Sequence, residues 1–259
     1  MGALRPIALI TGASTGIGAA FAHVFAKGDH ELVLVARRLA QLDAVARTIE
    51  ASGRRRPTII GIDLALGDAS ERLADELLSR GLEPSIVVNS AGFGLRGQAI
   101  ELDRVQQLEM IDLNVRTLTD LSLRWVDSMR RHGGGLINLS SLAGFFPGPG
   151  MAVYYATKAY VLAFTEALHR ELSMRGIKVT VVCPGPVETE FQVRAGIDPA
   201  RLPRLFTRGA ERVAREGYDG FMRGRRVVIT GTANKLVAIG SRFLPRAVTL
   251  GLAETYQLK

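Results

Sequence analysis

The sequence predicts an α/β protein, built as a doubly wound parallel sheet of about seven strands with helices on both faces. Short β-branched runs recur along the chain, and helical patterns separate them. The runs are continuously apolar, as expected for parallel strands that are covered on both faces. They occupy residues 6–10, 31–36, 58–63, 85–90, 136–141, 178–183 and 226–230.

The chain is expected to form a single domain over residues 1–259. Its length and its 47% hydrophobic content allow one sizeable domain or two small ones, but no Pro-rich or Ser-rich linker or repeat divides it. Residues 190–224 interrupt the alternation between the last two strands, where an insertion would cross the carboxyl ends of the sheet. This stretch could form a substrate lid or an ordinary packing segment, and the sequence does not favour either interpretation.

Composition argues against several kinds of site. Cys183 is the only cysteine, and the four histidines lack paired-ligand spacing, so neither a disulfide nor a metal site is predicted. The N-terminus lacks the regions of a secretory signal, and no apolar run approaches the roughly 20 residues that span a bilayer. We therefore expect a cytoplasmic protein.

The net charge of +8 comes mostly from arginines that are spread over the whole chain. The densest run, "GRRRP" at 53–57, is interpreted as a solvated loop because no aromatic interleaving or nucleic-acid motif accompanies it. No nucleic-acid partner is predicted. A positive field would also attract a phosphorylated cofactor or an acidic substrate.

The turn after the first predicted strand is rich in glycine. In "LITGASTGIG", residues 9–18, glycines permit positive φ and close backbone approach, while the free N–H groups of the next helix face a pyrophosphate. Such a turn is a weak signal alone, but its place at the start of a βαβ unit strengthens it. The predicted cofactor contacts here are Gly12, Ser14, Thr15, Gly16, Ile17 and Gly18.

Two arginines, Arg37 and Arg38, stand at the tip of the second predicted strand. An NAD-selective site would normally carry an acidic residue there, whereas a guanidinium can pair with the 2′-phosphate of NADP. The predicted cofactor is therefore NADP(H), with Arg37 as first choice, Arg38 as second, and the hydroxyls of Ser14 and Thr15 as helpers. Two solvated arginines opening a helix are the alternative, which competes mainly with the Arg38 assignment.

Two further strand ends face the same crevice. Asp63, which Leu64 follows, could hydrogen-bond the adenine amino group. "NSAG" at 89–92 places Asn89, Ala91 and Gly92 beside the first strand, at the switch point where dinucleotides lie.

The stretch "MAVYYATKAY" at 151–160 contains two adjacent tyrosines and one lysine. Tyr154 and Lys158 are four residues apart and share a helix face, whereas Tyr155 points about 100° away and is expected to pack. Ser141, at the end of the fifth strand, precedes Tyr154 by a loop that can bring both together. Reduction of a carbonyl needs a proton donor, and a neighbouring ammonium would lower the pKa of the tyrosine.

Asn114, in "IDLNV", has two possible roles on its predicted helix. Its side chain could anchor a water or backbone link from Lys158 towards solvent. It could equally make a structural polar contact.

Taken in order, these motifs resemble the short-chain dehydrogenase/reductase family over roughly residues 5–231. The resemblance rests on TGxxxGIG, NSAG, the helical Asn, the Ser, Tyr-xxx-Lys and "PGPVETE", with Ser90 as a mild departure from the usual second Asn. It implies a Rossmann-like fold, a homodimer or homotetramer, and NADP preference through Arg37. It implies a catalytic tetrad of Asn114, Ser141, Tyr154 and Lys158, and a nicotinamide lined by Pro184, Gly185, Val187 and Thr189.

Two functions follow from this pattern. The first is an NADP(H)-dependent oxidoreductase that interconverts a hydrophobic ketone or aldehyde and its alcohol, with Tyr154 as acid or base. The second is a non-catalytic NADP(H)-binding sensor or scaffold, which an intact tetrad disfavours. An apolar substrate pocket could draw on Phe93, Phe145, Phe146, Met151, Phe191 and Phe206, although aromatics near strand ends are as often core.

The C-terminal tail, residues 232–259, alternates apolar side chains with Lys235, Arg242 and Arg246. It could lie on an anionic membrane surface, but packing over the substrate cleft or against a partner subunit is the favoured interpretation. Pro245 argues against one continuous helix.

Overall fold

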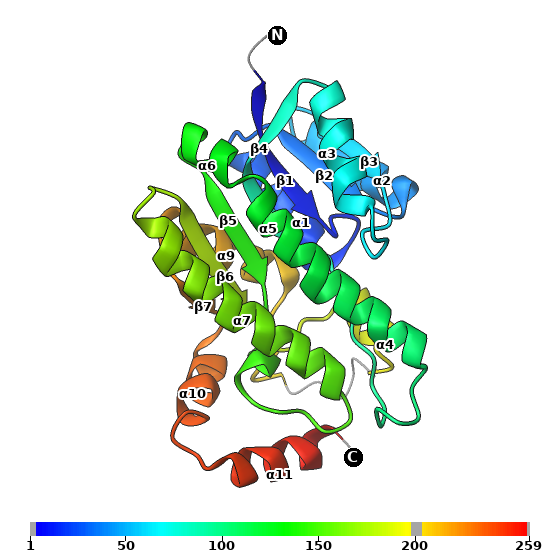
Figure 1. Ribbon diagram of the computed structural model, residues 1–259, viewed down its shortest axis with the longest axis vertical. Coiled ribbons are helices and arrows are strands. Elements are labelled where there is room, and N and C mark those ends of the chain that lie inside the picture. The colour runs from blue at the N-terminus through cyan, green and yellow to red at the C-terminus, as the bar shows by residue number, and fades with distance from the viewer. Residues whose placement is uncertain (1–3, 198–203, 258–259) are drawn as a thin grey trace.

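One parallel sheet of seven strands forms the centre of the computed structural model, which describes residues 4–197 and 204–257 (Figure 1). The strand order is β3–β2–β1–β4–β5–β6–β7, and all neighbouring strands are parallel. Each predicted run coincides with one strand to within a few residues, so the predicted fold class is confirmed. The strands are β1 Arg5–Thr11, β2 Leu32–Ala36, β3 Thr58–Gly61, β4 Leu82–Asn89, β5 Gly135–Leu139, β6 Lys178–Cys183 and β7 Val227–Ile229.

Helices cover both faces of the sheet, and each face has its own apolar core. Helices α1, α2 and α9 pack on one face around Phe21, Phe25 and Phe221, while α3, α5, α6 and α7 pack on the other. Alternate residues of β1 belong to the two cores: Ile10 lies in the first and Leu9 in the second. The helices are α1 Gly16–Lys27, α2 Leu39–Ala51, α3 Ala69–Ser79, α4 Arg104–Ile111, the π-helix η1 Asp112–Thr117, α5 Leu118–Arg124, α6 Val126–His132, the 3₁₀-helix η2 Leu142–Phe145, α7 Ala152–Ser173, α8 Glu190–Arg194, α9 Ala210–Met222, α10 Thr232–Gly240 and α11 Arg246–Gln257.

The segment predicted as a possible lid, residues 190–224, divides into two parts. Helix α9 belongs to the layer that covers the sheet, because Val213 and Phe221 are fully buried in the same core as Phe21 of α1. Gly217 makes this packing close: a Cβ there would lie 2.8 Å from the Phe21 ring. Helix α9 is therefore a packing element of the core, and the predicted lid does not extend over it. Residues 198–203 of the predicted segment lie outside the described residues.

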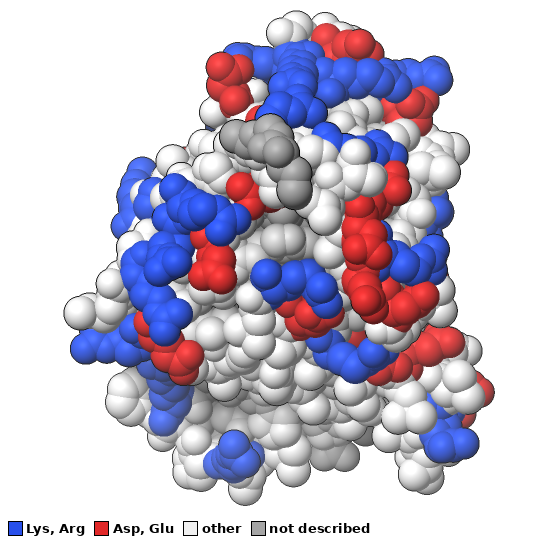
Figure 2. All heavy atoms as spheres, turned by 45° about the horizontal axis from the view of Figure 1, so that its top comes forward, with Lys and Arg blue, Asp and Glu red and all other residues white. Residues whose placement is uncertain are grey.

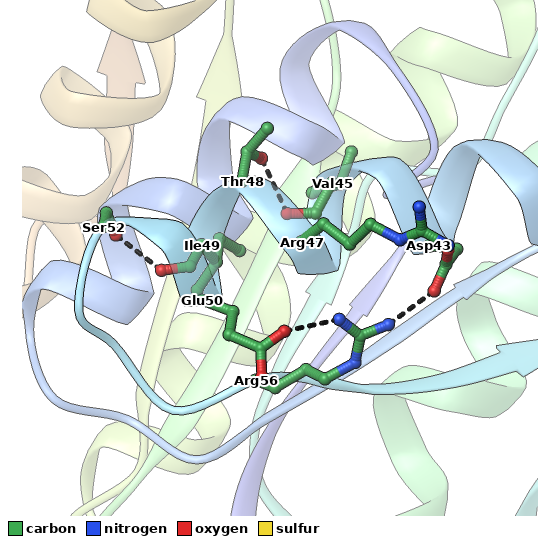
Figure 3. Close-up of polar contacts among 8 residues, drawn as sticks. All are labelled: Asp43, Val45, Arg47, Thr48, Ile49, Glu50, Ser52 and Arg56. Atoms are coloured by element: carbon green, nitrogen blue, oxygen red, sulfur yellow. Dashed lines mark hydrogen bonds and ion pairs between the residues drawn. The ribbon is translucent and has the colours of Figure 1, made fainter.

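The arginine run at 53–57 is compensated within the fold. Arg54 pairs with Asp29 and Arg55 with Glu31, at 3.7 and 2.7 Å. Arg56 bridges two carboxylates of α2, Asp43 at 2.5 Å and Glu50 at 2.6 Å (Figure 3). These pairs tie the loop before β3 to neighbouring elements.

The tail forms two helices, α10 and α11, which Pro245 separates as the sequence indicated. Both lie at the end of the molecule toward which the carboxyl ends of β5 and β6 point (Figure 1). No helix in the described ranges is long and apolar enough to cross a membrane.

Candidate active site

A single large cavity of about 1360 Å³ runs along the carboxyl ends of the strands. Its walls come from the loops after β1, β2, β3, β4, β5 and β6, and from the tail. Most predicted site residues line it: Gly12, Ser14, Thr15, Gly16, Ile17, Gly18, Arg37, Arg38, Asp63, Leu64, Ala91, Gly92, Ser141, Tyr154, Lys158, Pro184, Gly185, Val187 and Thr189. Asn89 and Asn114 do not.

The β1–α1 turn brings bare backbone to the cavity. Gly12 has a φ of +65°, and a Cβ there would lie 2.8 Å from the backbone of Ala91. A Cβ on Gly18 would run into the carbonyl oxygen of Gly12. Thr15 is the N-cap of α1 without a side-chain cap, so the first N–H groups of the helix stay free for an anion. The turn therefore fits the pyrophosphate of a dinucleotide.

Arg37 and Arg38 both line this end of the cavity. Arg37 is half exposed, and its Nη1 lies 3.5 Å from Oδ2 of Asp63. Arg38 donates from Nη2 to Oε2 of Glu190 at 2.6 Å and to the hydroxyl of Thr15 at 3.5 Å. Because Glu190 is the first residue of α8, Arg38 links the tip of β2 to the lid segment.

Asn89 was predicted to face the crevice, and the structure places it elsewhere. Its side chain is buried between β4 and its neighbours, donating to Oδ1 of Asn138 at 2.9 Å and to the hydroxyl of Ser122 at 3.1 Å. The side chains of adjacent strand residues alternate between the two faces of a sheet, so a position at a strand end does not by itself aim a side chain at the ligand edge.

Asn114 lies on the π-helical turn η1, and its amide joins two elements. It accepts from the backbone N–H of Phe93 at 3.1 Å, and it donates to the Phe93 carbonyl at 2.9 Å and to the Thr157 hydroxyl at 3.2 Å. The side chain is thus committed to a structural clamp between the loop after β4 and α7. Of the two roles that the sequence left open, these bonds support the structural one.

Tyr154 and Lys158 share one face of α7, as their spacing predicts. Nζ of Lys158 lies 5.8 Å from the centre of the Tyr154 ring and donates to the carbonyl of Leu139 at 2.9 Å. Ser141 caps η2, its hydroxyl accepting from the N–H of Ala143, and it also hydrogen-bonds Tyr154. A serine, a phenol and an ammonium therefore converge on one point of the cavity.

Burial governs the pKa values of this group. Burial raises the pKa of Tyr154, the hydrogen bond with Ser141 opposes that shift, and Tyr155 adds to it. Burial also lowers the pKa of Lys158 to about 8. The sequence predicted the opposite direction for Tyr154, through the charge of Lys158. The net shift is upward because removing the phenol from water outweighs the hydrogen bond with Ser141.

Aromatic side chains wall the cavity around Tyr154. The ring of Phe191, on α8, lies 5.3 Å from that of Tyr154, and Tyr155 packs between Phe146 and Tyr154 at ring distances of 6.0 and 6.1 Å. Of the six predicted pocket residues, five line the cavity: Phe93, Phe146, Met151, Phe191 and Phe206. Phe145 instead packs against a separate buried cluster around Cys183, because it leaves η2 on the side away from the cavity.

Sequence reasoning missed several cavity residues. Arg194 lies over the face of Phe93, 4.2 Å from its ring centre, and burial together with the charge of Arg37 lowers the pKa of its guanidinium. No motif marks this arginine. The tail also lines the cavity, which agrees with the alternative that it packs over the substrate cleft. Its lining residues are Val237, Gly240, Ser241, Leu244, Thr249 and Ala253.

The sequence is similar to a known protein family and to individual members of it. The family model for short chain dehydrogenase matches residues 6–199. Sulfoacetaldehyde reductase 2 of Chromohalobacter salexigens is 37% identical over 207 residues, which cover 78% of this chain and 81% of that protein.

Two solved structures resemble the fold over nearly the whole chain. A short-chain dehydrogenase from Sphingobium yanoikuyae in complex with NADPH aligns with a TM-score of 0.80 and 34% identity, over 92% of this chain and 94% of that one. A bulky-bulky ketone specific alcohol dehydrogenase from Comamonas testosteroni aligns with a TM-score of 0.76 and 28% identity, over 93% of both chains.

Proposed function

The chain belongs to the short-chain dehydrogenase family, and from that premise we propose that it is an NADP(H)-dependent oxidoreductase that interconverts a hydrophobic carbonyl compound and its alcohol. The observation that carries the proposal is one cavity with a dinucleotide cradle at one end and the Ser141–Tyr154–Lys158 group at the other. We name these the cofactor end, formed by the β1–α1 turn with Arg37 and Arg38, and the substrate end, formed by η2, Tyr154, α8 and the tail.

The cofactor end supports NADP(H) over NAD(H). Arg37 and Arg38 directly follow β2, where an NAD-selective site would carry an acidic residue, and Asp63 follows β3 instead. A 2′-phosphate would form charge-assisted hydrogen bonds with these guanidinium groups, in addition to their pairs with Asp63 and Glu190, whereas an unphosphorylated ribose carries no anion for them. The solved relative in complex with NADPH agrees with this assignment.

The substrate end supplies the proton chemistry. When bound, NADP(H) gives hydride to a carbonyl carbon or takes it from an alcohol. Tyr154 donates the proton that the developing alkoxide requires, and takes it back in the reverse direction. Ser141 holds the reacting oxygen near the phenol, and the ammonium of Lys158 stabilises the phenolate that forms. Asn114 keeps the loop after β4 and α7 in register, so that these groups stay aligned.

The walls of the substrate end favour apolar carbonyl compounds. Phe146, Met151 and Phe191 surround the tyrosine, and Phe191 comes from α8, in the segment that the sequence predicted as a possible lid. The Comamonas testosteroni relative is described as specific for bulky-bulky ketones, which suits such walls. Sulfoacetaldehyde is a small anionic aldehyde, so the name of the other relative points to a different substrate for that protein.

The test is cofactor consumption over a graded panel of aliphatic, aromatic and bulky ketones and aldehydes, with NADPH and NADH side by side. Tyr154→Phe serves as the blank, and Tyr155→Phe, its neighbour on the other helix face, as the matched control. We expect NADPH-preferring turnover that falls about 10²- to 10⁴-fold in Tyr154→Phe and stays within a few-fold in Tyr155→Phe. Retained turnover in Tyr154→Phe would refute the mechanism, and NADPH binding without turnover on any carbonyl would favour a binding protein.

A further inference from the structure

The outer face of the tail is apolar and exposed. Phe243 is 82% and Leu236 67% exposed, and Ile239, Leu244, Val248 and Leu250 are also open to solvent. Together with the exposed cations Lys235, Arg242 and Arg246 these residues form what we call the tail surface. None of the three cations makes an ion pair with any residue of the described ranges. Large apolar side chains gathered in this way mark an interaction site.

The same helices form part of the cavity on their inner side. Val237 of α10 and Ala253 of α11 line the cavity, and Leu244, between the two helices, is both a lining residue and a member of the tail surface. The tail is thus a thin wall, with the cavity on one side and the exposed apolar face on the other. Whatever covers the tail surface lies next to the substrate end.

The charge of the tail surface selects its occupant. Between Asp219 and Glu254 the sequence contains no acidic residue. A second copy that docked through the same surface would, by two-fold symmetry, bring three cations against three cations without a carboxylate to pair them. Anionic lipid headgroups complement the cations, while the acyl region accepts Phe243 and Leu236.

The rest of the molecule differs from this end. Figure 2 shows basic and acidic side chains crowding the upper part of the face in view, while the lower part, toward the end that carries α10 and α11 in Figure 1, is largely uncharged. Elsewhere on the surface, basic side chains form ion pairs with acidic ones, as Arg56 does with Glu50. Across residues 220–253, by contrast, every charged side chain is basic.

We infer that the tail surface docks on an anionic membrane and places the substrate end of the cavity against the lipid. Resting on the proposed function, this makes the substrate class a membrane-dissolved carbonyl compound that enters past the tail without crossing water. The docking itself needs no catalysis and can be measured without it.

The experiment is sedimentation of the intact protein with vesicles of phosphatidylcholine alone and of phosphatidylcholine mixed with phosphatidylglycerol. We expect binding to the mixed vesicles only, reduced about tenfold or more in Phe243→Ser and in the double variant Arg242→Gln, Arg246→Gln. Met174→Ser is the matched control, since Met174 is 92% exposed at the far end of α7. It should bind like the wild type, and NADPH affinity, measured on every variant, should be unchanged.

Three results would overturn the inference. The wild type could fail to sediment with either vesicle, or Phe243→Ser could bind like Met174→Ser. Analytical ultracentrifugation could also show that Phe243→Ser splits an oligomer while vesicle binding stays absent, which would assign the tail surface to a second copy. A failure of turnover with retained vesicle binding would refute the proposed function and leave the docking in place.

Discussion

The cofactor end and the substrate end of the cavity are made of different parts of the chain. At the cofactor end the ligand meets backbone, because the glycines of the β1–α1 turn leave no room for side chains and α1 offers its free N–H groups. At the substrate end it meets side chains, such as Phe191 and Leu244, from segments after β6. A backbone surface tolerates almost no substitution, whereas a side-chain surface can change residue by residue.

The largest effect is expected from a methyl group at the cofactor end. In Gly18→Ala the new Cβ would meet the carbonyl oxygen of Gly12, which is backbone and cannot turn aside. We expect NADPH affinity to fall about 100-fold or more, which is about 2.7 kcal/mol. Gly240→Ala, at the substrate end, places its Cβ in open space and should leave the affinity unchanged. Isothermal titration with NADPH checks both, and equal affinities would remove the contrast between the two ends.

Next in size is the arginine at the tip of β2. Arg37→Ala should lower NADPH affinity by about tenfold to 100-fold and leave NADH affinity within about twofold, since NADPH alone carries the 2′-phosphate that this guanidinium would bind. Arg47→Ala, an exposed arginine of α2 that pairs with Asp43, is the control. The ratio of the two kcat/KM values reports the change. A parallel loss for both cofactors would assign Arg37 a structural role.

A smaller effect is expected at the substrate end. Phe191→Ala removes the ring that lies beside Tyr154, and we expect KM for bulky hydrophobic ketones to rise about tenfold. The dissociation constant of NADPH should stay within about twofold, because Phe191 belongs to the side-chain surface. Steady-state kinetics and a separate NADPH titration distinguish the two parameters. A larger loss of NADPH affinity than of substrate affinity would show that α8 serves the cofactor end instead.

The smallest effect is a pH dependence set by Lys158. Burial lowers its pKa to about 8, so the ammonium is present below that pH and lost above it, while the raised pKa of Tyr154 keeps the phenol protonated throughout. Carbonyl reduction at saturating NADPH should therefore be level up to about pH 7, fall to half near pH 8, and continue downward. Lys158→Arg keeps its charge and should move the fall to higher pH. A flat wild-type profile from pH 7 to 10 would contradict the role given to the ammonium.

The sequence was sufficient for the sheet and for most of the cavity, for a physical reason. Buried parallel strands read as apolar runs, and the glycines of the β1–α1 turn are fixed by backbone geometry that other residues cannot adopt. Tyr154 and Lys158 were paired by helical spacing alone. In each case the information is local.

The misassigned positions depend on tertiary structure. Asn89 is the last residue of β4, but its side chain is buried and hydrogen-bonds Ser122 and Asn138 instead of facing the cavity. The amphipathic sequence pattern of helix α9 does not distinguish a lid helix from a core helix. The packing of α9 against Phe21 of α1 shows that it belongs to the core. The pKa of Tyr154 depends on burial, which no spacing reports.

The order of the strands also has a consequence for synthesis of the chain. β1 pairs with β2 on one side and with β4 on the other, and about 70 residues separate Thr11 from Leu82. At about 5–20 residues per second, the second edge of β1 waits several seconds on the ribosome before its partner exists. During that interval Leu9 and Ile10 belong to an open apolar strand edge, a template for pairing with other chains. β1, the strand that leads into the cofactor-binding turn, is thus the strand that a chaperone would most need to shield during translation.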